Sequence, residues 1–303
     1  MPLTLVADNE FAAAHLASGR VKIPGVKVVA TASGPLYPRA ISDAPYDVMV
    51  VPLANFVIAK DLGRPVTGIP VFPDMFFPHL GARVADGAGI NGPKDLEGKR
   101  VSTRGFSFNP AVWLRGALVH QYDVSIERIE WLEEEPNSMS GVGYPRSSRF
   151  SISKGGKPDE ELKSGAIDAA FFGRGGPDPV DGSHNLFADP LAEALAYRAL
   201  TGIFPPNTVM IAKDSSLATN PHLGQTVVDA CNEAWDIYCE EADDSDDHTG
   251  MSIKFLRENG MFPRRNGFVE AYAAVDTLIH YTYEQGLIRR LWAPEEIFVT
   301  GVV

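Results

Sequence analysis

Apolar runs rich in β-branched residues alternate with helical segments along the first part of the chain, and this alternation constrains the fold most. The run 46–52 (YDVMVVP) is continuous and apolar, which is typical of a parallel strand covered on both faces. A helical segment follows at 53–63 and ends at Gly63. The β-prone segments 3–7 and 26–32 predict two earlier strands. Strands that alternate with helices predict an α/β fold with a mainly parallel sheet.

The strand–helix pattern begins a second time near residue 83, and the chain ends in mostly helical segments. A chain of 303 residues, 45% of them hydrophobic, is long enough to bury the cores of two lobes. We expect residues 1–82 and 213–303 to form the first lobe, and residues 83–212 to form the second. A cleft between two such lobes is the usual place for a small-molecule ligand.

Charge and hydropathy argue against several classes of partner. The net charge of −12 disfavours binding to nucleic acid, which needs a basic surface. No apolar run reaches the ~18 residues of a membrane span, and the first residues lack the basic region of a secretory signal. We therefore expect a cytoplasmic protein with no membrane or nucleic-acid partner. Cys231 and Cys239 fall on one predicted helix, about two turns apart, so they are expected to remain thiols.

Two segments resemble cofactor motifs but lack the required context. Residues 87–92 (GAGING) have the glycine spacing of a dinucleotide-binding loop, yet only a short helix and another strand follow them. Residues 243–250 (DDSDDHTG) have the composition of a calcium loop, without the glycine and glutamate that such a loop needs. The histidines show no metal-site spacing. The sequence therefore predicts neither a metal site nor a cofactor.

The stretch 98–118 (GKRVSTRGFSFNPAVWLRGAL) places a cation and small polar groups just ahead of a helix. Asn109 is a good N-cap, and proline after it suits the first helical position. A helix N-terminus carries partial positive charge, and Arg104 and Ser107 precede it, so the stretch is predicted to receive a carboxylate. Arg115 lies in the second turn of the same helix. The alternative is that Asn109 only caps a helix and Arg104 is a surface residue.

Three further residues are candidates because of where they fall along the chain. His79 and Phe76 lie in an aromatic segment at a predicted crossing between the lobes. Arg174 ends a predicted buried strand, which in an α/β sheet points toward the ligand crevice. Cations and aromatic rings that converge on one cleft would suit a small aromatic acid.

Several segments together carry a resemblance to a known family. They are VFPDMFFPH (71–79), NPAVWLRGALVHQYDV (109–124), LKSGAIDAAFF (162–172), LFADPLAEALAYRALTGIFP (186–205) and YEQGLIRRLWAPEEIF (283–298). These segments resemble the 4,5-dihydroxyphthalate decarboxylase-like proteins. The similarity extends from the first strand to Phe298, and the order and spacing of the motifs agree.

The resemblance implies a fold and an activity. The fold is the type II periplasmic-binding-protein-like architecture, α/β with two lobes and a ligand cleft between them. The activity is that of a carboxy-lyase: decarboxylation of a hydroxylated aromatic carboxylate such as 4,5-dihydroxyphthalate, without an organic cofactor, with a general acid that protonates the ring carbon. The expected partner is a small anionic aromatic substrate.

The resemblance also suggests roles for individual residues. His79 matches the family's histidine after the aromatic–proline segment and is the candidate general acid. Arg115 lies in the family's VW-x-RG helix, and we expect it to hold a carboxylate together with Arg104 and the helix start at Asn109. Arg174 is expected to act as a second carboxylate clamp.

Alternatives stay open at this point. The same fold serves solute capture, so a non-catalytic protein that binds an aromatic or carboxylate solute is the main rival. An enzyme of another reaction class, acting on a different aromatic acid, is a third reading. A homo-oligomer is also open. The chain departs from the family pattern at Met75, at Pro78 and in the segments 104–106 and 206–207, which bears on the substrate.

Overall fold

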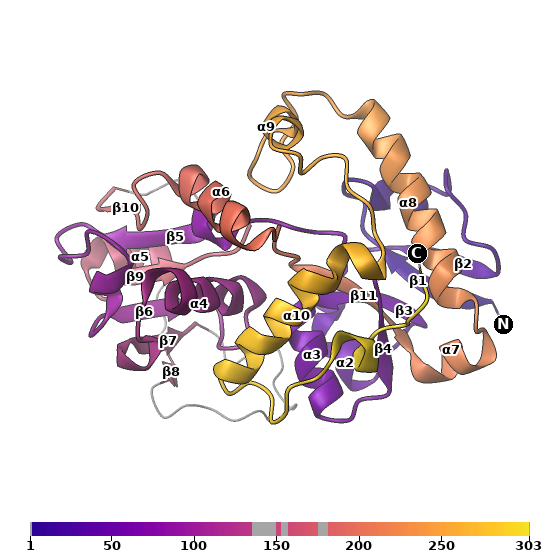
Figure 1. Cartoon of the computed structure of the whole chain (residues 1–303), viewed down its shortest axis with the longest axis horizontal. Coiled ribbons are helices and arrows are strands. Elements are labelled where there is room, and N and C mark those ends of the chain that lie inside the picture. The colour runs from indigo at the N-terminus through magenta and orange to yellow at the C-terminus, as the bar shows by residue number, and fades with distance from the viewer. Residues whose placement is uncertain (1, 135–149, 153–156, 175–180, 303) are drawn as a thin grey trace. The chain divides into compact units, whose positions relative to one another are not determined.

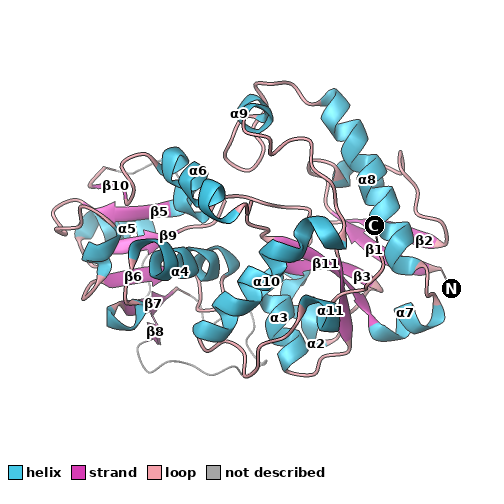
Figure 2. Cartoon of the chain, viewed as in Figure 1, coloured by secondary structure: helices cyan, strands magenta, loops and turns pink. Residues whose placement is uncertain are grey.

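The computed structural model describes residues 2–134, 150–152, 157–174 and 181–302. They form two compact units, each with its own sheet (Figures 1 and 2). Unit 1 comprises Met1–Met75, Pro206–Ile279 and Ile288–Val303, and unit 2 comprises Phe76–Pro205 and His280–Leu287.

The unit boundaries differ from the lobe boundaries expected from the sequence. The chain passes between the units at 75/76 and 205/206 rather than at 82/83 and 212/213. The segment 280–287 also groups with unit 2. Its Tyr281 ring packs edge-on against Trp113, with the ring centroids 5.7 Å apart. A helix pattern alone does not show that its last turn packs in a different unit from its beginning.

Unit 1 is built on a five-stranded sheet with the order β2-β1-β3-β11-β4. β1 is parallel to β2 and β3, whereas β11 is antiparallel to both of its neighbours, β3 and β4. The residues of β3 up to its final proline are buried, as its continuous apolar sequence predicts. The strands are β1 (Leu3–Ala7), β2 (Val26–Ala30), β3 (Val48–Pro52), β4 (Val66–Ile69) and β11 (Thr208–Lys213).

The longest helix of unit 1, α8 (Leu223–Glu241), packs an apolar stripe against that sheet. Its buried Val227, Val228 and Cys231 belong to one core with Leu5 and Val48. Both cysteines lie on α8 as free thiols, as the sequence predicts. The other helical segments are α1 (Ala13–Ala17), η1 (Gly34–Leu36), α2 (Tyr37–Ser42), α3 (Leu53–Asp61), α7 (Asp214–Thr219), α9 (Ile253–Glu258), α10 (Phe268–Glu284) and α11 (Pro294–Ile297).

Unit 2 is built on a six-stranded sheet with the order β10-β5-β9-β6-β7-β8. The strands β9, β6, β7 and β8 run parallel, and β5 is antiparallel to both β9 and β10. The fold class is therefore α/β with mainly parallel sheets, as predicted. The strands are β5 (Ala82–Ala85), β6 (Arg100–Thr103), β7 (Glu130–Glu133), β8 (Phe150–Ile152), β9 (Ala169–Phe171) and β10 (Ser183–Asn185).

The helix α4 (Asn109–Tyr122) contributes the centre of the unit 2 core. Its buried Ala111, Leu114 and Leu118 pack with Val101 of β6 and Trp131 of β7. The other helical segments of unit 2 are η2 (Pro78–Gly81), η3 (Pro93–Leu96), η4 (Ile126–Arg128), α5 (Pro158–Ser164) and α6 (Pro190–Thr201).

Two local predictions are wrong. The stretch 134–157, with several glycines and prolines, predicts a long irregular segment. Yet β8 lies inside it and pairs in parallel with β7; residues 135–149 and 153–156 are outside the described residues. Asn109 is the first helical residue of α4 rather than its cap. Phe108 takes the cap position in an extended conformation, and its carbonyl accepts the N–H of Val112 at 3.0 Å.

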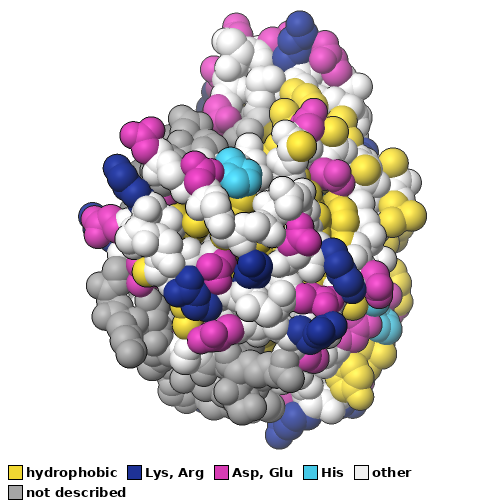
Figure 3. All heavy atoms as spheres, turned by 90° about the vertical axis from the view of Figure 1, so that its left-hand side faces the viewer, with side chains coloured by type: hydrophobic (Ala, Val, Ile, Leu, Met, Phe, Trp, Pro, Cys, Tyr) yellow, Lys and Arg dark blue, Asp and Glu magenta, His cyan; other side chains and the backbone are white. Residues whose placement is uncertain are grey.

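The surface adds two observations about partners. Across the described residues, the helices are either too short or too polar to span a bilayer. On the face drawn in Figure 3, Lys and Arg side chains are interspersed with Asp and Glu side chains. Because a phosphate backbone is held by concentrated positive charge, this face does not have the character of a nucleic-acid track.

Candidate functional site

Four candidate residues of unit 2, Arg104, Ser107, Asn109 and Arg174, lie in the segments that follow its parallel strands β6 and β9. β6 and β9 are adjacent, with Thr103 opposite Phe171, and β7 lies on the other side of β6, with Glu133 opposite Thr103. The segments that follow, 104–109 and 172–174, therefore leave the sheet at the same edge. We call these two segments, with Glu133, the unit 2 edge. In an open α/β sheet, ligands bind outside the carboxyl ends of the strands.

The two predicted cations at the unit 2 edge are exposed. Arg104 directly follows β6, and Arg174 lies three residues beyond the end of β9. Adjacent strands are about 5 Å apart, so the segments that carry Arg104 and Arg174 leave the sheet at neighbouring points of one edge. The predicted roles of Arg104 and Arg174 as carboxylate clamps stay predictions.

The small polar residues of the edge are buried in the turn that opens α4. Ser107 is 0% exposed and Asn109 is 1% exposed. The N–H of Phe108 donates to the carbonyl of Gly105 at 3.1 Å, which closes the turn. α4 is a helix of 14 residues, and its first N–H groups carry the positive end of the helix dipole.

Arg115 is buried and bonded to that turn. It is 0% exposed, its Nε donates to Oε1 of Gln285 at 2.7 Å, and its Nη2 donates to the carbonyl of Phe106. Its guanidinium carbon lies 4.8 Å from the centre of the Phe106 ring. These contacts tie Arg115 to the protein itself, and its predicted role as a carboxylate clamp stays a prediction.

His79 lies in η2, which joins the same edge from the antiparallel strand β5. The N–H of Phe172 donates to the carbonyl of Gly81 at 2.8 Å, so the end of η2 lies against the segment that follows β9. The imidazole of His79 is 0% exposed, and its ring centre lies 5.3 Å from that of Phe187 and 5.5 Å from that of Tyr197. Within the described part of the chain, neither ring nitrogen has a hydrogen-bond partner.

This apolar enclosure keeps the imidazole neutral. Burial lowers the pKa of His79 from 6.5 to about 4, because a charged ring loses its hydration among aromatic neighbours. At neutral pH the ring therefore carries no charge in this state of the protein. Its predicted role as proton donor stays a prediction, and it demands that substrate binding raise this pKa.

The lowered pKa of His79 predicts a pH-dependent stability. An unfolded histidine titrates near 6.5, so between that pH and about 4 the unfolded chain binds a proton that the folded chain excludes. The contribution of the neutral ring to the free energy of unfolding is fully present above pH 6.5 and is lost as the pH falls toward 4. We expect the wild-type free energy of unfolding to fall, from pH 7 to 4.5, by about 2 kcal/mol more than that of His79→Phe. Urea titrations at both pH values measure this difference, and parallel losses in the two proteins would contradict it.

Phe76 completes the predicted set. Its side chain is 3% exposed, and its N–H donates to the carbonyl of Pro205 at 3.1 Å. These contacts place it at the start of unit 2, beside the returning chain. Its predicted role in binding substrate stays a prediction.

Sequence reasoning missed buried polar residues that support the unit 2 edge. Glu133, the last residue of β7, is 0% exposed, and its Oε1 accepts the N–H of Phe106 at 2.8 Å. Gln285 is bonded to Arg115 and also donates from Nε2 to the carbonyl of Val112 at 2.9 Å. A signal for Glu133 was present, because the rule that selected Arg174 at the end of a buried strand applies equally to Glu133.

A second group that was missed lies at the corresponding edge of unit 1. Arg264 stacks over Trp235, 4.1 Å from the ring centre, and donates to the carbonyl of Phe72, which follows β4, at 2.7 Å. Burial lowers the pKa of Arg264 to about 10. His248 is 1% exposed, and its Nδ1 lies 3.2 Å from the hydroxyl of Tyr238. The sequence offered only the pair Arg264 and Arg265 as a hint.

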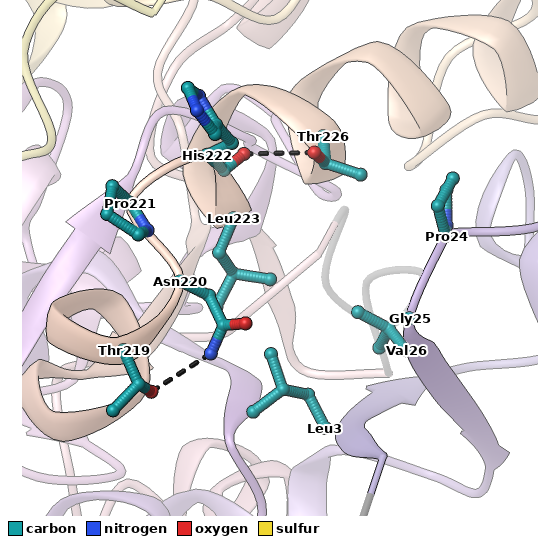
Figure 4. Close-up of a pocket in the computed structure, with 10 residues that line it drawn as sticks. All are labelled: Leu3, Pro24, Gly25, Val26, Thr219, Asn220, Pro221, His222, Leu223 and Thr226. Carbon is teal, nitrogen blue, oxygen red and sulfur yellow. Dashed lines mark hydrogen bonds between the residues drawn. The ribbon is translucent and has the colours of Figure 1, made fainter.

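A hollow of about 290 Å³ in unit 1 is unrelated to these edges. Figure 4 shows its lining, which comes from the amino ends of β1 and β2 and from the turn between α7 and α8. Leu3, Val26 and Leu223 form its apolar part, and Asn220 donates to the hydroxyl of Thr219 at 2.9 Å. It shares no residue with the predicted site. Among the residues that the structure describes, no three His, Cys, Asp or Glu side chains gather as a metal site would require.

Known proteins similar to the chain agree with the family resemblance. A Comamonas testosteroni protein named 4,5-dihydroxyphthalate decarboxylase is 25% identical over 319 residues, which cover 98% of this chain and 96% of that protein. A Pseudomonas putida protein of the same name is 26% identical over 215 residues, which cover 66% of this chain and 82% of that protein. No protein-family model matches the chain. The resemblance predicted from the motifs is confirmed by these two relatives.

Solved structures confirm the fold. The periplasmic aliphatic sulphonate-binding protein SsuA from Escherichia coli has a TM-score of 0.53 at 12% identity, with 98% of each chain covered. A mutant of the enzyme DszB in complex with biphenyl-2-sulfinic acid has a TM-score of 0.60 at 16% identity, with 99% of this chain and 97% of that chain covered. At such low identities these structures show the fold alone, which is the predicted type II periplasmic-binding-protein-like fold of two α/β lobes. The ligand cleft between the lobes stays a prediction.

Proposed function

We propose that this chain, which resembles the 4,5-dihydroxyphthalate decarboxylases along nearly its whole length, decarboxylates a hydroxylated aromatic carboxylate such as 4,5-dihydroxyphthalate. The observation that carries the proposal is the similarity to the Comamonas testosteroni protein of that name, which covers 98% of this chain. The unit 2 edge supports it with two exposed arginines and the amino end of a 14-residue helix. Guanidinium groups and helix N–H groups are the partners that a dianionic aromatic acid needs.

The reaction breaks the bond between a ring carbon and its carboxylate carbon. Carbon dioxide leaves, the bonding electron pair stays on the ring carbon, and a proton takes the vacated position. A hydroxyl para to that carbon makes it more basic and so easier to protonate. The protein must hold the second carboxylate, keep water from the departing one and deliver the proton.

Each task has a candidate in unit 2. Arg104 and Arg174 bind the carboxylate that is retained, together with Ser107 and the first N–H groups of α4. Arg115 contributes through the Phe106 carbonyl, which it holds in the turn. His79 delivers the proton after an approaching carboxylate has raised its pKa, since an anion beside imidazole stabilises the charged ring.

Two related compounds test the proposal. Purified protein is incubated with 4,5-dihydroxyphthalate, and we expect carbon dioxide release and formation of 3,4-dihydroxybenzoate, measured by mass spectrometry. Phthalate is the matched control: it has both carboxylates but no hydroxyl to feed electron density into the ring, so we expect calorimetric binding without turnover. Binding of both compounds with no product after long incubation would refute catalysis and favour the solute-binding alternative.

A further inference from the structure

The backbone N–H and the backbone carbonyl of Phe106 are both held by buried side chains. Its N–H donates to Oε1 of Glu133 at 2.8 Å, and its carbonyl accepts a hydrogen bond from Nη2 of Arg115. Glu133 and Arg115 are both 0% exposed. Phe106 lies between Arg104 and Ser107, in the turn that joins β6 to α4.

The two side chains contact the backbone of Phe106 from different elements of unit 2. Glu133 ends β7 directly opposite Thr103, the last residue of β6, so its carboxyl group lies under the start of the turn. Arg115 comes from the second turn of α4, and its guanidinium also lies over the rings of Phe106 and Trp131, at 4.8 and 5.3 Å from their centres. The two peptide groups that flank Phe106 are therefore fixed, one relative to a strand and the other relative to a helix.

Because the backbone of Phe106 is buried, the folded state is destabilised if either of these two hydrogen bonds is missing. If the partner of a buried backbone N–H or carbonyl is removed, the unpaired group destabilises the folded state. The chain around it then shifts to recover a hydrogen bond. Groups that receive a ligand bind it best when their geometry is set beforehand, because no ordering is then required on binding.

We infer that Glu133 and Arg115 are positioning residues, which preset the backbone of the 104–107 turn for a substrate carboxylate. The ligand in this inference rests on the proposed function. Neither residue needs to touch the substrate. Each acts through the backbone of Phe106, and so on the direction of Arg104, of Ser107 and of the first N–H groups of α4.

Variants at Glu133 test the inference, because alanine removes the acceptor whereas glutamine keeps an oxygen in its place. In Glu133→Ala we expect the Phe106 amide to exchange its hydrogen about tenfold faster or more, as expected for loss of a buried hydrogen bond. We expect KM for 4,5-dihydroxyphthalate to rise about tenfold with kcat within about threefold, since the carboxylate is bound alike in the ground and transition states. Glu133→Gln should stay within about threefold of wild type in both measurements. The matched control is Glu130→Gln on the exposed start of the same strand, which should change neither.

The outcomes separate this inference from the proposed function. An unchanged Phe106 exchange rate in Glu133→Ala would overturn the inference, whether or not the wild-type protein turns over. Faster exchange with an unchanged KM, or a lower kcat alone, would also overturn it, because that pattern indicates a smaller folded fraction. If the wild-type protein neither binds nor decarboxylates 4,5-dihydroxyphthalate, the proposed function fails and the positioning role for that ligand fails with it, while the exchange data still decide whether the turn is held.

Discussion

Replacing Gly116 by alanine is expected to lower the free energy of unfolding by about 3 kcal/mol, a cost at the upper end for an overpacked core. Gly116 lies in α4, and a Cβ there would lie 2.0 Å from Cδ2 and 2.2 Å from Cε2 of Tyr281. That ring is buried, packs edge-on against Trp113 and stacks on His120, so it has little freedom to move. Alanine favours a helix over glycine by about 1 kcal/mol, which offsets only part of the clash. The midpoint of urea unfolding measures the effect.

A control and a double variant isolate the clash. Gly92→Ala, in the same unit, adds a Cβ with nothing within 4 Å, so its unfolding midpoint should stay near that of wild type. In a Tyr281→Ala background the ring is gone, and Gly116→Ala should become neutral or slightly stabilising through helix propensity. A full loss of stability in that background would show that the cost does not come from Tyr281.

The architecture was predictable from the sequence because hydrophobic periodicity reports burial directly. The apolar run of β3 is buried on both faces. The helix predicted to end at Gly63 runs to Asp61, and Gly63 takes a left-handed conformation at φ 72°. Arg174 was located by a rule that depends only on strand direction, and Arg104 by its position just ahead of a predicted helix. A parallel strand brings its carboxyl end to one edge of the sheet, so residues that follow neighbouring strands lie close together whatever their separation along the chain.

What the sequence could not predict is which side chain points where around that edge. Arg115 and Arg104 are the same residue type in one short stretch, yet Arg115 is 0% exposed and Arg104 is exposed. The difference comes from α4, which directs Arg115 toward the Gln285 oxygen, supplied by a segment 170 residues further along the chain. The expected cap at Asn109 failed for a related reason, because Phe108 adopts the extended cap conformation itself. A contact between distant segments decides the first case, and the local conformation of the turn decides the second.

His79 shows how burial changes the meaning of a candidate residue. The family resemblance, in which His79 matches a histidine after the aromatic–proline segment, led to the proton-donor hypothesis. The three-dimensional surroundings of Phe77, Phe187 and Tyr197 lower its pKa to about 4. A neutral imidazole is a poor acid, so the hypothesis now includes a condition. The charge of the substrate must enter this apolar enclosure and favour the protonated ring.

We therefore expect His79→Phe to reduce kcat/KM for 4,5-dihydroxyphthalate by about 10²- to 10⁴-fold, the range typical of a lost general acid. Phenylalanine keeps an aromatic ring of similar size among the three neighbouring rings, so the fold at pH 7 should persist, as circular dichroism can check. In the wild-type protein kcat/KM should rise about tenfold for each pH unit between pH 8 and 5.5, because the free protein titrates near pH 4. The profile of kcat should bend at a higher pH, since it reports the complex.

His184→Gln is the matched control for this prediction. The imidazole of His184 is exposed on β10 and paired with Asp86, so its replacement should leave both pH profiles unchanged. A kcat/KM that stays flat from pH 8 to 5.5 in an active wild-type protein would exclude a cationic His79 as donor. A His79→Phe variant with normal turnover would exclude any proton transfer from this ring. In either case His79 would serve only in packing, and the proton would have to come from another group that contacts the substrate.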